Sequence, residues 1–190
     1  MKRLILAAVL ALIAAPALAA PVAYKLDPAH TQTTFAVDRF GFTTVLGAFT
    51  QSEGTIWIDE AEPAKSRVEA VIKIASLFAG DATRDEHLKG ERWLNAAAHP
   101  LATFVSTKVV TTGADTADVT GDMTVNGQTH EITLKVKLNK IGKAPGSGKQ
   151  SAGFTITGVI PRKLFGVTTA ANVIGDRVDL RIEALGVAAE

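Results

Sequence analysis

The side chains best suited to acid–base or metal chemistry in this sequence are its four histidines, His30, His87, His99 and His130. No two of them share a spacing typical of a metal-binding pair, and Asp85-Glu86-His87 is not a zinc-protease motif. The chain has no cysteine, which excludes thiolate ligands and thiol nucleophiles. We therefore expect no metal ion. For His30 and His87 we favour structural hydrogen bonds at turns over a ligand or catalytic role.

The serines show no sign of nucleophilic catalysis. A serine hydrolase of the nucleophile-elbow type holds its serine on a sharp strand-to-helix turn, with a histidine and an acid brought to it. None of the chain's serines has that context: Ser52, Ser66, Ser76, Ser106, Ser147 and Ser151. The glycine-rich run 143–149 (KAPGSGK) is not a phosphate-binding loop, because its spacing is wrong and no helical pattern follows. We expect no catalytic residue and no cofactor.

The amino terminus has the pattern of a secretory signal peptide. Lys2 and Arg3 precede an apolar run over residues 4–15, and residues 17–19 (ALA) suit a signal peptidase. A transmembrane anchor is the alternative, but the run is shorter than the roughly 20 apolar residues that span a bilayer. Cleavage after Ala19 would leave residues 20–190 as one domain in the bacterial periplasm, without stable membrane insertion.

The charge balance excludes several kinds of partner. The segment 1–19 carries two cations and no acid, so the remaining chain has a net charge of −1 instead of +1. That balance makes no electrostatic case for binding nucleic acid or an anionic membrane surface. Without cysteine there are no disulfides and no lipid-anchored amino terminus, so stability must come from packing.

Most of the remaining sequence alternates apolar and polar residues with the period of two that is typical of half-buried strands. In the run 67–74, Val68, Ala70 and Ile72 share one face, and charged residues share the other. Strands are predicted over 34–40, 44–49, 54–59, 67–74, 103–110, 118–125, 129–138, 152–160 and 173–187.

Two segments interrupt the strands in a recognisable way. Asn126-Gly127 lies between two alternating runs and predicts a tight hairpin turn, because both residues tolerate positive φ. We expect His130 to be exposed beside that turn. The charged segment 81–94 predicts one or two helical turns with Asp81 as a possible cap.

Eight or nine consecutive strands with short connections favour an up-and-down antiparallel sheet. Its apolar face must be buried, either by closure into a barrel or by folding into a sandwich. The interior of an eight-stranded barrel is just wide enough for side chains or for one elongated ligand.

Several stretches, taken in order, resemble the YceI family. They are 27–37 (DPAHTQTTFAV), 46–49 (LGAF), 84–100 (RDEHLKGERWLNAAAHP), 103–106 (TFVS), 121–134 (GDMTVNGQTHEITL) and 161–166 (PRKLFG). The resemblance implies an all-β, lipocalin-like, up-and-down antiparallel barrel of eight strands with a short helical insertion. It implies a periplasmic, non-enzymatic carrier of a long-chain isoprenoid or other amphiphilic lipid. Two alternatives stay open: an interaction partner of a membrane b-type cytochrome, and a lipid- or isoprenoid-modifying enzyme. A homodimer is a further possibility.

The resemblance favours a hollow interior over a filled one, with the lipid tail along an apolar wall and the head at the mouth. The predicted wall residues are Phe35, Val37, Phe42, Phe49, Trp57, Trp93, Phe104, Met123, Phe154, Ile156 and Phe165. The predicted head-group residues are Arg39, His87 and Arg162. Arg39 stands where the family usually has a histidine, and a guanidinium suits a phosphate or carboxylate. Asp27 and Arg162 are either a salt bridge between barrel ends or two unrelated exposed charges.

Overall fold

The structure is a computed structural model, and it describes residues 20–189. The predicted signal peptide, residues 1–19, lies outside the described residues. The strands of the barrel wall are β1 (Val22–Leu26), β4 (Ser52–Ile58), β5 (Arg67–Lys73), β7 (Leu101–Thr111), β8 (Thr116–Val125), β9 (Gln128–Lys143), β10 (Gln150–Pro161) and β11 (Ile174–Ala188). The remaining elements are β2 (Gln32–Arg39), β3 (Thr43–Phe49), β6 (Leu77–Phe78), the helix α1 (Ala82–Lys89) and the short 3-10 turns η1 (Pro63–Lys65), η2 (Ile74–Ser76) and η3 (Arg162–Phe165).

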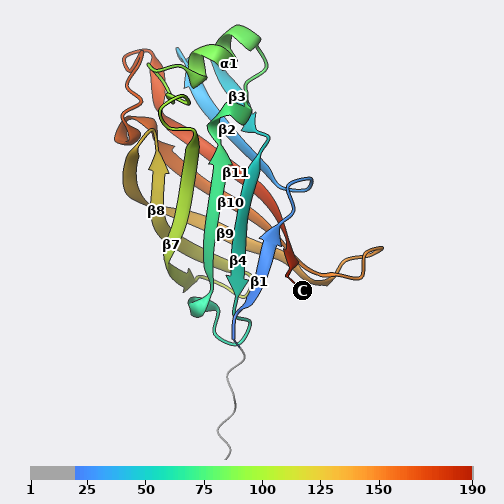
Figure 1. Ribbon diagram of the computed structural model, residues 1–190. Helices are drawn as coiled ribbons and strands as arrows, with labels where there is room; N and C mark the ends of the chain where they lie inside the picture. Colours follow the sequence, from blue (N-terminus) through green and yellow to red (C-terminus); the bar gives the residue numbers. More distant parts are fainter. Residues whose placement is uncertain (1–19, 190) are drawn as a thin grey trace, which may run out of the picture.

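The sheet closes into an eight-stranded antiparallel barrel, which confirms the predicted fold class. The ring runs β1-β4-β5-β7-β8-β9-β10-β11, and β11 returns to β1 (Figure 1). β11 has two neighbours along its other edge: it pairs with β2 over residues 174–183 and with β1 over residues 186–188. β2 continues through β3 to the two-residue strand β6. The edge of β11 that faces away from β10 is therefore covered by β1 near its carboxyl end and by β2 over the rest. β3 extends the sheet beyond β2.

Alternation decides which side chains enter the barrel. Ile56, Val68 and Ile72 line the interior, whereas Arg67 and Glu69 form an exposed ion pair outside. The predicted Asn126-Gly127 turn joins β8 to β9 with φ values of 49° and 72° at its two residues. His130, expected to be exposed, is half-buried and packs edge-on against the ring of Phe165.

Two apolar clusters occupy different ends of the barrel. One closes the end opposite α1 with Tyr24, Ala152, Phe154 and Ala184, of which Tyr24 is 1% exposed. The other packs side chains of β7, β8, β9 and β10 against Phe165 of η3. Residues of both clusters also line the cavity described below.

Asp81→Ala should lower the free energy of unfolding by about 1 kcal/mol, because it removes the amino-terminal cap of α1. The Asp81 carboxylate accepts a hydrogen bond from the backbone N–H of Arg84 at 2.8 Å. Urea denaturation followed by tryptophan fluorescence measures the change. Glu86→Ala is the matched control, since Glu86 is an exposed residue of the same helix. Equal losses in the two variants would show that the cap bond contributes nothing.

Candidate functional site

The interior of the barrel contains a cavity of about 600 Å³. That volume falls within the 300–1,000 Å³ range typical of small-molecule sites. Its lining is mostly apolar and comes from the barrel strands, β2, β3 and the α1 segment. Four exposed ionisable residues are on this lining: Asp38 and Arg39 at the end of β2, and Asp81 and His87 of the α1 segment, which lies at the same end of the barrel (Figure 1). This end is the mouth of the cavity.

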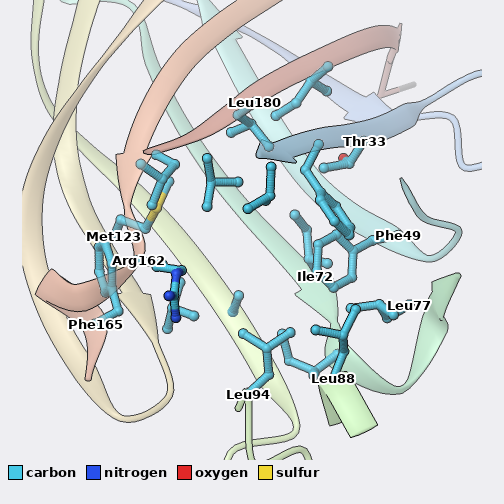
Figure 2. Close-up of a pocket in the computed structure, with 18 of the residues that line it drawn as sticks. Thr33, Phe49, Ile72, Leu77, Leu88, Leu94, Met123, Arg162, Phe165 and Leu180 are labelled. Carbon is cyan, nitrogen blue, oxygen red and sulfur yellow. The ribbon is translucent and has the colours of Figure 1, made fainter. Parts of the chain in front are cut away.

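Eight of the eleven predicted wall residues line the cavity: Phe35, Val37, Phe49, Trp93, Phe104, Met123, Ile156 and Phe165. In Figure 2, Phe49 of β3, Met123 of β8 and Phe165 of η3 surround the same space. The rings of Phe35 and Phe49 lie 5.7 Å apart. Gly47 makes room for them, because a Cβ at this position would come within 2.2 Å of the Phe35 ring.

Three predicted wall residues do not line the cavity. Phe42 is 90% exposed in the turn after β2, because it lies beyond the last paired residue of the strand. Trp57 is on the outer face of β4, since its neighbour Ile56 faces inward, and the Arg67 guanidinium stacks on its ring at 3.4 Å. Phe154 faces inward but belongs to the cluster that closes the far end of the barrel. The prediction was wrong for these three positions.

The wall also contains leucines that sequence reasoning missed. Leu77, Leu88 and Leu94 come from β6, from α1 and from the turn after α1, and Figure 2 shows them beside the cavity. The sequence signal for two of them was present, because Leu88 and Leu94, the latter next to the predicted wall residue Trp93, are apolar residues in a strongly charged segment. Their spacing alone does not show that the segment folds over the mouth of a barrel.

Arg39 at the end of β2 and His87 of α1, two of the three predicted head-group residues, are both on the lining of the cavity. Both side chains are exposed and line the cavity. The Arg39 guanidinium stacks over the neighbouring Phe40 ring at 4.4 Å. Within residues 20–189 neither side chain has an ion-pair or hydrogen-bond partner, so both are available to a ligand. The turn hydrogen bond expected for His87 is therefore not present.

Arg162 lines the cavity (Figure 2), but most of its donors are bonded to the protein backbone. It is 6% exposed, and its Nε and terminal nitrogens donate to the backbone carbonyls of Val167, Thr169, Ile174 and Gly175 at 2.7–3.0 Å. Burial lowers the pKa of the Arg162 guanidinium, which still stays charged at neutral pH because arginine ionises so far above it. With four of its five N–H groups occupied, Arg162 is a support for the loop after η3.

The suggested pairing of Asp27 with Arg162 does not form. The Asp27 carboxylate instead contacts His30 Nδ1 at 2.7 Å, and this hydrogen bond lowers the pKa of Asp27. His30 thus has the structural role at a turn that was expected of it. Within residues 20–189, no group of three histidine or carboxylate side chains is arranged to hold a metal ion.

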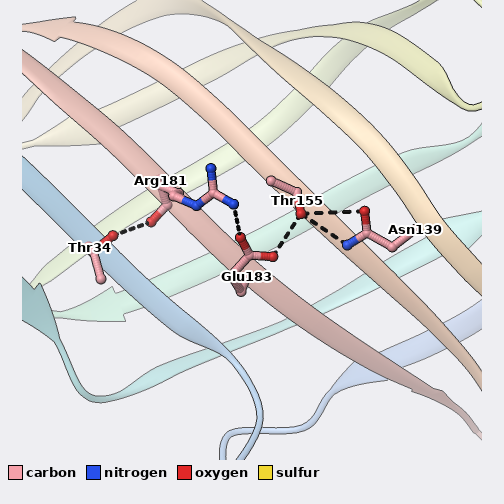
Figure 3. Close-up of polar contacts among 5 residues, drawn as sticks. All are labelled: Thr34, Asn139, Thr155, Arg181 and Glu183. Carbon is pink, nitrogen blue, oxygen red and sulfur yellow. Dashed lines mark hydrogen bonds and ion pairs between the residues drawn. The ribbon is translucent and has the colours of Figure 1, made fainter.

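Polar residues on the outside of the barrel are bonded to one another. The Arg181 guanidinium donates to Glu183, the Thr155 hydroxyl donates to the same carboxylate at 2.7 Å, and Asn139 donates to Thr155 (Figure 3). The Thr155 hydrogen bond, followed by the one from Arg181, lowers the pKa of Glu183. None of these side chains lines the cavity, so this network stabilises the outer surface of the barrel. The mouth is the polar part of the site.

No helix in residues 20–189 combines the length and the apolar character needed to cross a membrane.

Comparison with known proteins gives concordant results. The model of the YceI-like domain family matches residues 24–185. Protein YceI of Escherichia coli O17:K52:H18 is 39% identical over 166 residues, which cover 86% of each chain. The crystal structure of Burkholderia cenocepacia BcnA superposes with a TM-score of 0.76 at 24% identity, over 84% of this chain and 98% of that one. A polyisoprenoid-binding domain of Saccharophagus degradans, implicated in plant cell wall breakdown, superposes with a TM-score of 0.69 at 14% identity, over 88% and 99%. The two structures establish the shared fold.

Proposed function

The chain belongs to the YceI-like domain family, and from this premise we propose that it is a periplasmic carrier of a long-chain amphiphile. The ligand class is an isoprenoid lipid, whose tail lies in the barrel and whose polar head stays at the mouth. Its role is to transport, store or sequester that lipid without changing it chemically. The signal-like pattern of residues 1–19 supports export to the periplasm.

The observation that carries this proposal is the shape of the cavity: apolar along its length and polar at one end. Each methylene that leaves water for such a wall contributes about 0.8 kcal/mol, and the ordering of a flexible tail offsets part of that gain. A few polar groups at one end give the ligand a direction. An amphiphile with a long tail and one head has the matching chemistry. The name of the Saccharophagus degradans domain supports an isoprenoid as the tail.

Arg39 and His87 are the groups we assign to the head. Arg39 offers a planar fork of N–H donors that suits a phosphate or carboxylate head, and His87 of α1 lines the same cavity. Arg162 is left out of this role because its donors are already bonded to backbone carbonyls.

Native mass spectrometry of protein released from the periplasm should show the polypeptide with one discrete added mass. Organic extraction should then release a compound with the repeating five-carbon fragments of an isoprenoid. The denatured protein should have the mass of the polypeptide alone, which controls for covalent modification. Recovery of straight-chain fatty acids would overturn the isoprenoid assignment. A ligand-free protein that also fails to take up added prenols would overturn the carrier itself.

A further inference from the structure

The turn between β2 and β3 displays two aromatic side chains at the mouth of the barrel. Phe42 is 90% exposed and Phe40 is 41% exposed. The turn directly follows Asp38 and Arg39, which line the cavity, and the end of β2 lies at the same end of the barrel as α1 (Figure 1). At 90% exposed, Phe42 gains almost nothing from the packing of the barrel itself.

The backbone of the β2–β3 turn is strained at Phe40, which has a positive φ. Phe40 and Gly41 have φ values of 61° and 70°, and the Phe42 N–H donates to the Arg39 carbonyl at 3.1 Å. Two positive φ values in a tight hairpin turn favour Asn and Gly, and a bulky residue there is costly. The hairpin turn between β8 and β9 uses Asn126-Gly127 with similar φ values. The β2–β3 turn thus retains an aromatic residue where its geometry favours a small polar one.

Further apolar and cationic groups lie beside the turn. Val173, 43% exposed, accepts the Phe40 N–H at 3.0 Å and so lies directly next to it. Arg39 and Lys163 are exposed cations without an ion-pair partner among residues 20–189. The nearby carboxylates of Asp38 and Asp176 instead accept backbone N–H groups, those of Gly41 and Lys163. The rim therefore combines exposed aromatics with two cations that form no ion pair and two carboxylates that are bonded to the backbone.

We propose that this rim, Phe40, Phe42 and Val173 with Arg39 and Lys163, docks on the surface of a lipid bilayer and turns the mouth of the cavity toward it. The inference rests on the proposed function, since a long-chain amphiphile must be collected from or delivered to a bilayer. Phe42 and Phe40 enter the interfacial region, where an aromatic ring is favoured, and the cations contact lipid phosphates.

The size of the rim favours a bilayer over a protein partner. Three such side chains offer at most about 500 Å² of apolar surface, well below the roughly 800 Å² per partner of a stable protein interface. A bilayer needs no matching surface and accepts a small protruding wedge. Because the chain is almost neutral overall, long-range attraction is weak, and insertion of the aromatic residues must supply most of the affinity.

Vesicle flotation of the mature protein tests this inference. The wild type should float with vesicles of phosphatidylethanolamine and phosphatidylglycerol, and several-fold less with vesicles lacking phosphatidylglycerol. Phe42→Ser should weaken the partition constant by about tenfold, the equivalent of burying most of one aromatic side chain. Phe78→Ser is the matched control, because Phe78 is 58% exposed and pairs with Ala48 at the other end of β3. Phe40→Asn should also bind vesicles more weakly, and because Asn suits the turn it should melt no earlier than the wild type.

Binding of a detergent-solubilised prenol separates this inference from the proposed function. Phe42→Ser should bind it as the wild type does, because Phe42 does not line the cavity. A wild-type protein that binds the prenol but floats with neither vesicle would overturn docking and leave the carrier function standing. Equal losses of flotation for Phe42→Ser and Phe78→Ser would also overturn it. A protein that floats but takes up no prenol would instead remove the carrier function.

Discussion

Ile156→Trp should remove most of the bound lipid while lowering the free energy of unfolding by less than about 1 kcal/mol. Ile156 faces the cavity from β10, between Val136 of β9 and Ile182 of β11, and all three line it. In a close-packed core the larger side chain would cost about 1–3 kcal/mol. Here it can enter the cavity, where it takes the place of part of the tail. Losing contact with two or more methylenes weakens binding by at least about tenfold.

Val159→Trp is the control for this experiment. Val159 is on the same strand but faces outward and is 40% exposed, so a tryptophan there should change neither lipid content nor stability. Thermal melting and extraction of co-purified lipid measure both quantities in the two variants. If Ile156→Trp unfolded several kcal/mol more easily and still carried the wild-type amount of lipid, this face of β10 would be packed core instead of cavity wall.

Arg162→Lys should lower the free energy of unfolding by about 2–4 kcal/mol, although it preserves the charge. The guanidinium joins the carbonyls of Val167 and Thr169 in the loop after η3 to those of Ile174 and Gly175 at the start of β11. An ammonium group on an unbranched stem cannot reach all four. At least two of these buried or half-buried carbonyls then lose their donor, at about 1–3 kcal/mol each.

Arg177→Lys is the matched control for Arg162→Lys. Arg177 forms an exposed ion pair with Asp179, and pairs of this kind contribute less than about 1 kcal/mol. Urea denaturation compares the two variants, and prenol binding is measured on the folded fraction of each. A head-group role for Arg162 would produce the opposite pattern: normal stability with weakened binding. That pattern would show that the loop after η3 does not depend on the guanidinium.

Local patterns in the sequence were sufficient to predict most of the fold. The strands β5, β8 and β10 were each found within about two residues of their observed ends, because one buried face imposes alternation on a strand. The helix α1 was found because charge and a capping aspartate interrupt that alternation. The strand β1 was missed. Its five residues pair with β4 and with the end of β11, and so short a run is not enough to predict either pairing from the sequence.

The sequence determined which residues are apolar, but the tertiary structure decided which of them form the site. Alternation places Ile56 and Trp57 on opposite faces without saying which face is inside, so Trp57 was assigned to the wrong one. Phe154 and Ile156 share a face, yet one closes the end of the barrel and the other lines the cavity.

Arg162 shows the same limit for a charged residue. The motif 161–166 marked Arg162 as a candidate functional residue. Its hydrogen bonds to four carbonyls of two later segments give it a structural role instead. The physical reason is that periodicity and turn chemistry act between neighbours in the chain. Cavities, mouths and buried hydrogen-bond networks are instead formed by residues that are distant in sequence and meet only when the barrel closes.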